Sequence, residues 1–185
     1  MNAMRTILTI ATISISNICL AGDPKAIGDV VGRDIDQPYA GHVGMWTGGS
    51  VLEVLANPGT IYENSLTSFK NQPSVSNPKI MKAYWGARAT SNLTATQKQN
   101  VINAGRAQKA YNPQYTTAFS YTEGKYASYC VQYNQYGQCA RYQTYMISAV
   151  FRCDTFVQYS YKKGANYSVS GLLPRNVWNS FPIVR

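Results

Sequence analysis

The chain of 185 residues is poor in the side chains that usually carry enzyme chemistry. It has one histidine, four cysteines and eight carboxylates, against 17 lysines and arginines. A single histidine without a Cys-x-x-Cys motif gives no zinc-ligand pattern, so we expect no metal and no other cofactor. Any imidazole chemistry must then be that of His42.

Long apolar runs are missing except near the start. Residues 6–18 form an apolar segment, and Cys19, Leu20 and Ala21 follow with the small-residue spacing of a signal-peptidase site. The run is shorter than the roughly 20 residues that span a bilayer. We therefore expect a signal peptide over residues 1–21, export to the periplasm or beyond, and one domain over residues 22–185 without a transmembrane segment. Lipidation at Cys19 is the alternative, although Ile18 stands where such sites prefer a small residue.

Acidic side chains are fewer than basic ones. Removing Arg5 with the signal would leave 16 basic and 8 acidic side chains, a net charge of +8. Such an excess favours anionic partners, including cell-wall polymers and lipid headgroups. The basic residues form no dense block, since Lys162-Lys163 is the nearest to one. This dispersion argues against nucleic-acid binding.

The cysteines divide into a pair and a remainder. Cys130 and Cys139 flank the turn-like residues 134–137, so they could form a disulfide across a hairpin in an oxidising compartment. Cys153 is then left over. In an exported protein a leftover cysteine indicates a reactive thiol or an intermolecular bond, and the alternative is an inert buried side chain.

Hydrophobic patterning predicts an α+β domain. The Thr94/Gln97 capping box begins a helix that ends before Asn112-Pro113. A second helix is expected from about Cys153 to Lys163 with Gly164 beyond its end. Trp178 and Phe181 are expected to pack back on the core. Alternating or short apolar runs predict strands over 28–33, 39–46, 51–55, 61–62 and 79–85, and a loop is expected over 65–78.

Residues 111–145 are rich in tyrosine and nearly free of aliphatic side chains. This composition predicts a β-ribbon or a lid-like insertion. Its tyrosines could stack on sugars or line a groove. Alternatively they cover the edge of the core, because tyrosine is favoured on half-buried pleated surfaces.

The expected register of a hairpin predicts a partner for His42. A two-residue Gly48-Gly49 loop would place Met45 opposite Leu52. His42 and Glu53 would then be diagonal neighbours on one face, at a separation of about 7–8 Å that long side chains can bridge. A loop of different length would move Glu53 to the other face. A carboxylate beside an imidazole fixes its tautomer and stabilises its charged form.

Cys153 is expected to open its helix. First-turn amides and the helix dipole stabilise negative charge there, and a nearby imidazolium would favour the thiolate. The amide of Cys153 is a natural oxyanion donor. Asp154 is expected to complement the helix dipole rather than to catalyse.

Four segments together resemble the NlpC-type papain-like cysteine peptidases, and more specifically their circularly permuted, YiiX-like branch, in which the histidine precedes the cysteine. These segments are Gly28-Asp29-Val30-Val31, Gly41-His42-Val43-Gly44-Met45-Trp46, Val51-Leu52-Glu53-Val54 and Phe151-Arg152-Cys153-Asp154-Thr155-Phe156-Val157. The helix from about Thr94 to Tyr111 also fits that branch.

The resemblance implies a papain-like fold, with a small antiparallel sheet packed against helices. It further implies a catalytic triad of Cys153 as nucleophile, His42 as base and Glu53 as orienting partner. The family commonly cleaves amide bonds in cell-wall peptides, so peptidoglycan stem peptides are the expected substrate. Permuted relatives include lipid hydrolases and acyltransferases, which is the first alternative. An inactive domain that binds a glycan or a protein is the second. Asp154 departs from the family pattern, where a small residue commonly follows the cysteine.

Overall fold

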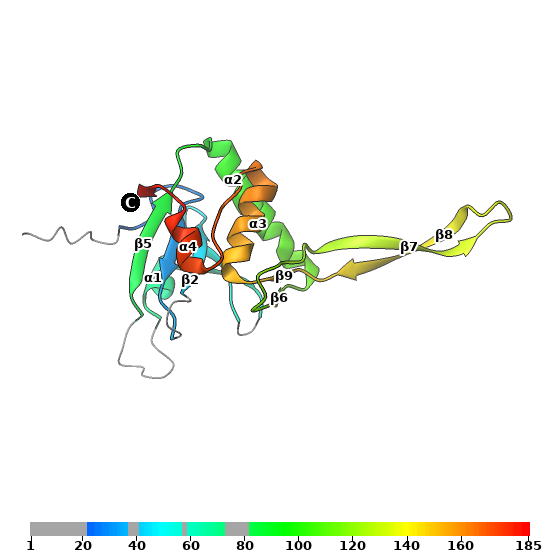
Figure 1. Cartoon of the computed structure of the whole chain (residues 1–185), viewed down its shortest axis with the longest axis horizontal. Helices are drawn as coiled ribbons and strands as arrows, with labels where there is room; N and C mark the ends of the chain where they lie inside the picture. Colours follow the sequence, from blue (N-terminus) through cyan, green and yellow to red (C-terminus); the bar gives the residue numbers. More distant parts are fainter. Residues whose placement is uncertain (1–21, 37–40, 57–58, 73–81) are drawn as a thin grey trace, which may run out of the picture.

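The computed structural model describes residues 22–36, 41–56, 59–72 and 82–185. The expected signal peptide, Cys19, and residues 39–40 and 79–81 of the expected strands lie outside this part. Within it the chain forms a mixed α+β body from which one long ribbon projects (Figure 1). The described residues contain no helix with the length and apolarity needed to cross a membrane.

The body is organised around a six-stranded antiparallel sheet with strand order β10-β5-β1-β2-β3-β4. Its strands are β1 (Val30–Arg33), β2 (His42–Trp46), β3 (Val51–Val54), β4 (Ile61–Asn64), β5 (Tyr84–Ala89) and β10 (Ile183–Val184).

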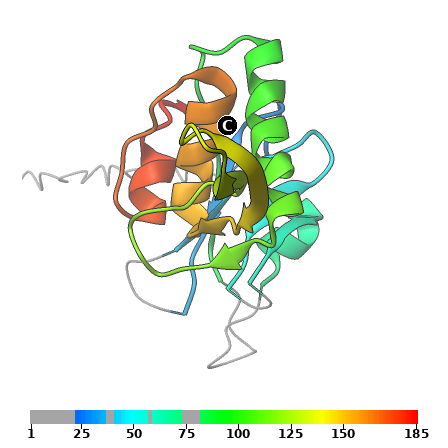
Figure 2. The same ribbon diagram turned by 90° about the vertical axis from the view of Figure 1, so that its right-hand side faces the viewer.

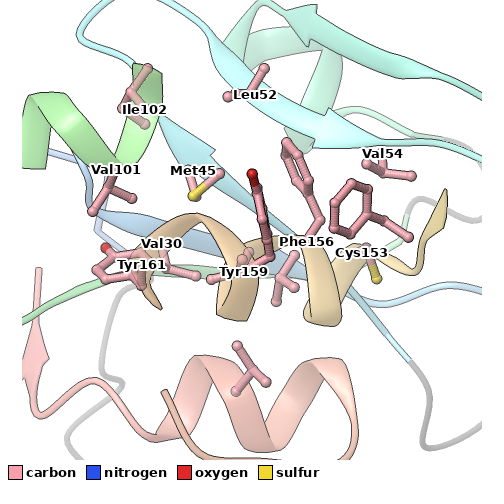
Figure 3. Packing of buried hydrophobic residues seen from close by; sticks show 14 of the residues in the cluster. Val30, Met45, Leu52, Val54, Val101, Ile102, Cys153, Phe156, Tyr159 and Tyr161 are labelled. Atoms are coloured by element: carbon pink, nitrogen blue, oxygen red, sulfur yellow. The ribbon is translucent and has the colours of Figure 1, made fainter. Parts of the chain in front are cut away.

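Alternation along the strands gives the sheet two apolar faces. Val43 and Met45 of β2 pack into the larger core with α2 (Ala95–Ala107), α3 (Cys153–Ala165) and α4 (Pro174–Asn179). The opposite face carries Val51 and the smaller cluster around Phe69 of α1 (Leu66–Lys70). Figure 3 shows Met45 and Leu52 above the rings of α3 in the larger core.

Helices α2 and α3 pack closely because small residues lie where they meet. A Cβ on Gly105 would come within 3.0 Å of both Leu52 and Phe156. A Cβ on Gly164 would come within 2.5 Å of the backbone of Asn100. Gly164 lies inside α3, which continues to Ala165, so the expectation that it follows the helix is wrong. The left-handed residue at the helix end is Asn166, an asparagine where glycine is the commoner choice.

Of the other local predictions, some are confirmed and others are wrong. The capping box of Thr94 and Gln97 is present, and Trp178 and Phe181 are buried in the core. The expected loop over 65–78 is wrong in its first part, because Ser65 caps the short helix α1. The strand expected over 79–85 begins at Tyr84 and continues to Ala89.

A long two-stranded ribbon extends from the body. It consists of β7 (Lys125–Tyr133) and β8 (Cys139–Ile147), closed near its tip by a disulfide between Cys130 and Cys139. Both the ribbon and the disulfide were expected. Figure 1 shows that the strands run away from the sheet and helices, and Figure 2 looks at the body from the side of the ribbon.

The ribbon's tyrosines do not cover the core. All six are exposed, so the expectation of an edge-covering role is wrong for them; they are Tyr126, Tyr129, Tyr133, Tyr136, Tyr142 and Tyr145. Tyr111 and Tyr115, which precede the ribbon, do pack against the core. Two short pieces join this region to the body: 3-10 helix η1 (Gln108–Tyr111), and β6 (Gln114–Tyr115) paired in parallel with β9 (Val150–Phe151).

Candidate active site

The β2–β3 hairpin has the register that the sequence predicts. Met45 lies opposite Leu52, and the amide of Thr47 donates to the carbonyl of Ser50 at 2.8 Å across the Gly48-Gly49 loop. Gly48 has φ +101°, a conformation that glycine adopts without steric cost. The hairpin therefore places His42 and Glu53 on the same face.

His42 and Glu53 form a buried pair. Nε2 of His42 lies 2.6 Å from Oε2 of Glu53, and the two residues are 6 % and 2 % exposed. Gly44 stands between them on the face, and a Cβ there would lie 3.3 Å from the Cβ of Glu53. The absence of that side chain gives the carboxylate room to reach the ring.

Cys153 is the second group that acts on the imidazole electrostatically. It is buried and not disulfide-bonded, and it begins α3. Figure 3 shows it on that helix at the margin of the core. Burial alone would lower the pKa of His42, but the charge of Cys153, a hydrogen bond with it and the interactions with Glu53 raise that pKa to about 9. Because Nε2 faces Glu53, Nδ1 is the nitrogen left for the thiol.

Two residues that the sequence did not single out complete the surroundings of Glu53. Asn64 on β4 donates from Nδ2 to Oε1 at 2.6 Å. Arg33 on β1 lies directly opposite His42. Burial would raise the pKa of Glu53, but hydrogen bonds from His42 and Asn64 and the charge of Arg33 hold it below its usual value. The carboxylate is therefore held as an anion.

Arg33 is itself unusual, because an arginine is here only 4 % exposed. It lies over the ring of Phe69 at 5.0 Å, and its Nε has no hydrogen-bond partner among the described residues. Burial lowers its pKa, while the charges of Glu53 and Cys153 act in the opposite direction. Phe69 also contacts the His42 ring, with centroids 5.8 Å apart. The ring of Phe69 thus packs against the His42 side of the ion pair, and the buried cation of Arg33 lies beside the pair.

A cavity of about 230 Å³ opens next to the thiol. Its wall is largely apolar and is formed by four separate segments of the chain. The lining residues are Ile35, Gly41, Tyr115, Thr117, Arg152, Cys153, Leu173 and Pro174. The cavity therefore borders Cys153 although this residue is only 2 % exposed.

Arg152 connects the walls of this cavity. Its guanidinium donates to Oδ1 of Asp154 at 2.6 Å and to the carbonyl of Leu172 at 2.6 Å, and it lies 4.3 Å from the ring of Phe119. The hydrogen bond with Asp154 raises the pKa of Arg152. Asp154 also accepts the amide of Thr155 at 2.9 Å, so its expected place at the helix N-terminus is confirmed.

Tyr115 is a further residue that sequence reasoning missed. Burial, followed by the charges of Cys153 and Asp154, raises the pKa of its hydroxyl to about 12. The hydroxyl therefore stays protonated at neutral pH. Its only sequence signal was its place in the tyrosine-rich segment, and that gave no reason to prefer it over the eight other tyrosines of residues 111–145.

The arrangement defines a class of site: a buried thiol, imidazole and carboxylate at the N-terminus of a helix. No family model matches the chain, and no curated protein or solved structure is significantly similar to it. Among the described residues no cluster of three His, Cys, Asp or Glu side chains could hold a metal ion.

Proposed function

We propose that the protein is an exported cysteine hydrolase with a permuted, NlpC-type papain-like fold. Cys153 is the nucleophile, His42 the base and Glu53 its orienting partner. The observation that carries this proposal is the 2.6 Å contact between Nε2 of His42 and Glu53, with Cys153 as the other partner of the ring. The carboxylate fixes the orientation of the ring and leaves its other nitrogen available to a thiol.

The reaction follows from these positions. His42 takes the proton of the Cys153 thiol, and the sulfur attacks the substrate carbonyl carbon. The carbon–nitrogen bond then breaks as His42 returns the proton to the leaving amine, which leaves an acyl group on the sulfur. Water attacks this thioester with His42 as base, and the carboxylic acid and free thiol are released.

The developing oxyanion needs donors near the sulfur. The first amides of α3 have no intrahelical partner, and the helix N-terminus favours negative charge. The amide of Cys153 is the donor that follows from its position as the first helical residue. Loss of one such donor typically costs about a hundred- to thousandfold in rate.

The preferred substrate is an amide in peptidoglycan stem peptides. A net charge of +9 on the whole chain suits an anionic cell-wall polymer, and the Cys130–Cys139 disulfide suits an oxidising compartment. The apolar cavity wall of Ile35, Leu173 and Pro174 favours a second candidate, an acyl hydrolase or acyltransferase acting on lipid esters through the same three residues.

The first experiment measures the reactivity of the thiol. Iodoacetamide is expected to label the wild type faster than free cysteine at pH 7, and to label Cys153→Ala not at all. His42→Ala should slow labelling by an order of magnitude or more, since it removes the imidazolium that stabilises a thiolate. Arg175→Ala, outside the cavity lining, is the matched control. Labelling of the wild type no faster than free cysteine would contradict the enzyme and leave an inactive binding domain.

The second experiment distinguishes the substrates. The wild type is incubated separately with muropeptides and with phosphatidylglycerol vesicles, and products are followed by mass spectrometry. New amines from muropeptides that are absent with Cys153→Ala support the amidase. Free fatty acid from the vesicles, again absent with the variant, assigns the lipid alternative.

A further inference from the structure

Arg33 is a charged residue beside the site that the proposed reaction does not use. It ends β1 directly opposite His42 on β2, and it is buried. Its Nε has no hydrogen-bond partner among the described residues. A buried charge with unmet hydrogen-bonding groups is costly, so a guanidinium persists there only where other interactions compensate for that cost.

A ring and two charges provide this compensation. The Cζ of Arg33 lies 5.0 Å from the centre of the Phe69 ring, a contact that strengthens when water is excluded. Both carboxylate oxygens of Glu53 already have other partners, so Arg33 acts on Glu53 through its charge. Burial lowers the pKa of Arg33, whereas the charges of Glu53 and Cys153 raise it. Because such interactions are mutual, Arg33 stabilises the anionic forms of both residues.

The reactivity of the site depends on how many protons Cys153 and His42 hold together. With two protons they are a thiol and an imidazolium, and the site has neither a nucleophile nor a base. With one proton they can form the reactive pair of thiolate and imidazolium. The Glu53 carboxylate makes the one-proton state negative overall and the two-proton state neutral. Since a buried net charge is unfavourable, Glu53 by itself would favour the unreactive state, and the positive charge of Arg33 reverses this preference.

The neighbouring titratable groups are paired or uncharged. Arg152 donates from Nε to Asp154 at 2.6 Å. Tyr115 stays protonated at neutral pH because burial, followed by nearby charges, raises its pKa to about 12. Burial likewise raises the pKa of Tyr84, which lies opposite Arg33 on β5. Two flanking ion pairs are Lys70 with Asp23 at 2.8 Å and Lys82 with Asp36 at 3.3 Å. Within the described part of the chain, Arg33 is therefore the cation that can balance the thiolate.

We propose that Arg33 is a positioning residue of the hydrolase, whose buried charge offsets that of Glu53 and so favours the state in which Cys153 and His42 share a single proton. The second proton of the pair goes to solvent, and the remaining one moves between Sγ and the imidazole. Arg33 acts through these two residues and does not touch the substrate. The proposal rests on the hydrolase function, because it assigns a role within the same site.

The pH dependence of thiol labelling tests this role. Iodoacetamide labelling rates are measured between pH 5 and 9.5 for the wild type, Arg33→Met and Arg33→Lys. Arg33→Met removes the charge and keeps an unbranched side chain, so the pH of half-maximal rate should rise by about one unit. Arg33→Lys keeps the charge and should follow the wild type. A merely structural role would not distinguish the two variants by charge.

Arg88→Met is the matched control. Arg88 also lies over a ring, that of Trp178 at 4.2 Å, and its Nε also has no partner among the described residues. It is nevertheless opposite Val30 at the other end of β1, away from His42. Its loss therefore removes a similar cation and ring contact, and the pH profile of labelling should remain that of the wild type.

Arg33→Gln is measured as well, so that the result does not depend on one uncharged variant, and urea denaturation checks that each variant folds. The proposal is overturned if Arg33→Met and Arg33→Gln keep the profile of an activated wild type. It is also overturned if Arg33→Lys or Arg88→Met shifts as far as Arg33→Met, or if both uncharged variants fail to fold, which would make Arg33 structural. Wild-type labelling no faster than free cysteine would instead overturn the hydrolase and this role together.

Discussion

Glu53 is bound at both carboxylate oxygens, and this determines how the neighbouring imidazole is held. One oxygen contacts His42 and the other accepts a hydrogen bond from Asn64. A carboxylate with 2 % exposure is costly without such partners. The two contacts therefore explain both why an acidic residue can occupy a buried strand and why the ring has one orientation.

Replacing Asn64 by alanine tests this support. One oxygen of a buried carboxylate would lose its donor, so the free energy of unfolding should fall by about 1–3 kcal/mol. Urea denaturation measures the loss, and Tyr62→Ala on the same strand is the control because Tyr62 is 37 % exposed. Thiol labelling should slow less than in Glu53→Gln, since Glu53 itself remains. Equal stability of Asn64→Ala and the wild type would contradict the supporting role.

The raised pKa of His42 predicts a pH dependence of stability. The ring titrates near its ordinary value of 6.5 when unfolded and at about 9 when folded. Its charged interactions therefore stabilise the fold fully below pH 6.5, and this contribution is lost as pH rises through 9. The size of the loss is at most about 3 kcal/mol.

Urea denaturation at pH 6, 7.5 and 9.5 measures this effect as the difference between wild type and His42→Gln, which cancels the titration of groups that do not interact with His42. The difference should shrink between pH 6.5 and 9. If it stays constant across that range, the imidazolium is not stabilised in the folded protein.

Among the helices and strands, the sequence predicted best those features whose signals lie in neighbouring residues. The Gly-Gly loop determined the register of β2 and β3, and the capping box located the start of α2. Helix α1 was missed because five residues cannot display a helical period. Strand β10 has only two residues and pairs with β5, so nothing local identifies it. Asn64 and Arg33 were missed for a related reason: their place beside Glu53 and His42 depends on which strands are neighbours.

The contact between α2 and α3 predicts that Gly164→Ala destabilises the protein. Helix propensity alone favours alanine by about 1 kcal/mol. The new Cβ would nevertheless meet the Asn100 backbone at 2.5 Å, and such overpacking costs about 1–3 kcal/mol. Urea denaturation should therefore show a loss, whereas Asn103→Ala on the exposed face of α2 should change stability by less than about 0.5 kcal/mol. A gain in stability for Gly164→Ala would mean that the helices separate without cost.

We expect the Cys130–Cys139 disulfide to stabilise the ribbon locally and not the whole protein. It closes a loop with a sequence separation of nine, which corresponds to about 2–3 kcal/mol in the chain-entropy account. In the Cys130→Ser/Cys139→Ser double variant, amides of β7 and β8 should exchange faster with deuterium, and those of α3 should not. Faster exchange in α3 would show that the ribbon supports the body.

On the scale of the whole molecule, the body and the ribbon differ in how they are stabilised. The body buries a continuous core between the sheet and three helices, and the ribbon exposes its side chains along both strands. The base of the ribbon is held by the body, since the Gly124 amide donates to Gln108 at 2.7 Å and the Ala149 amide to Tyr111 at 2.9 Å. These contacts lie outside β7 and β8, so the body does not depend on the strands themselves.

Shortening the ribbon tests this separation directly. Replacing residues 127–145 by Asn-Gly would leave Tyr126 opposite Met146 next to a favoured two-residue turn. The thermal midpoint should change by no more than a few degrees, because little buried apolar surface is removed. Iodoacetamide labelling of Cys153 should keep its rate. A body that no longer unfolds cooperatively would show that the ribbon belongs to the folding unit. Slower labelling with an intact body would instead place the ribbon in the active site.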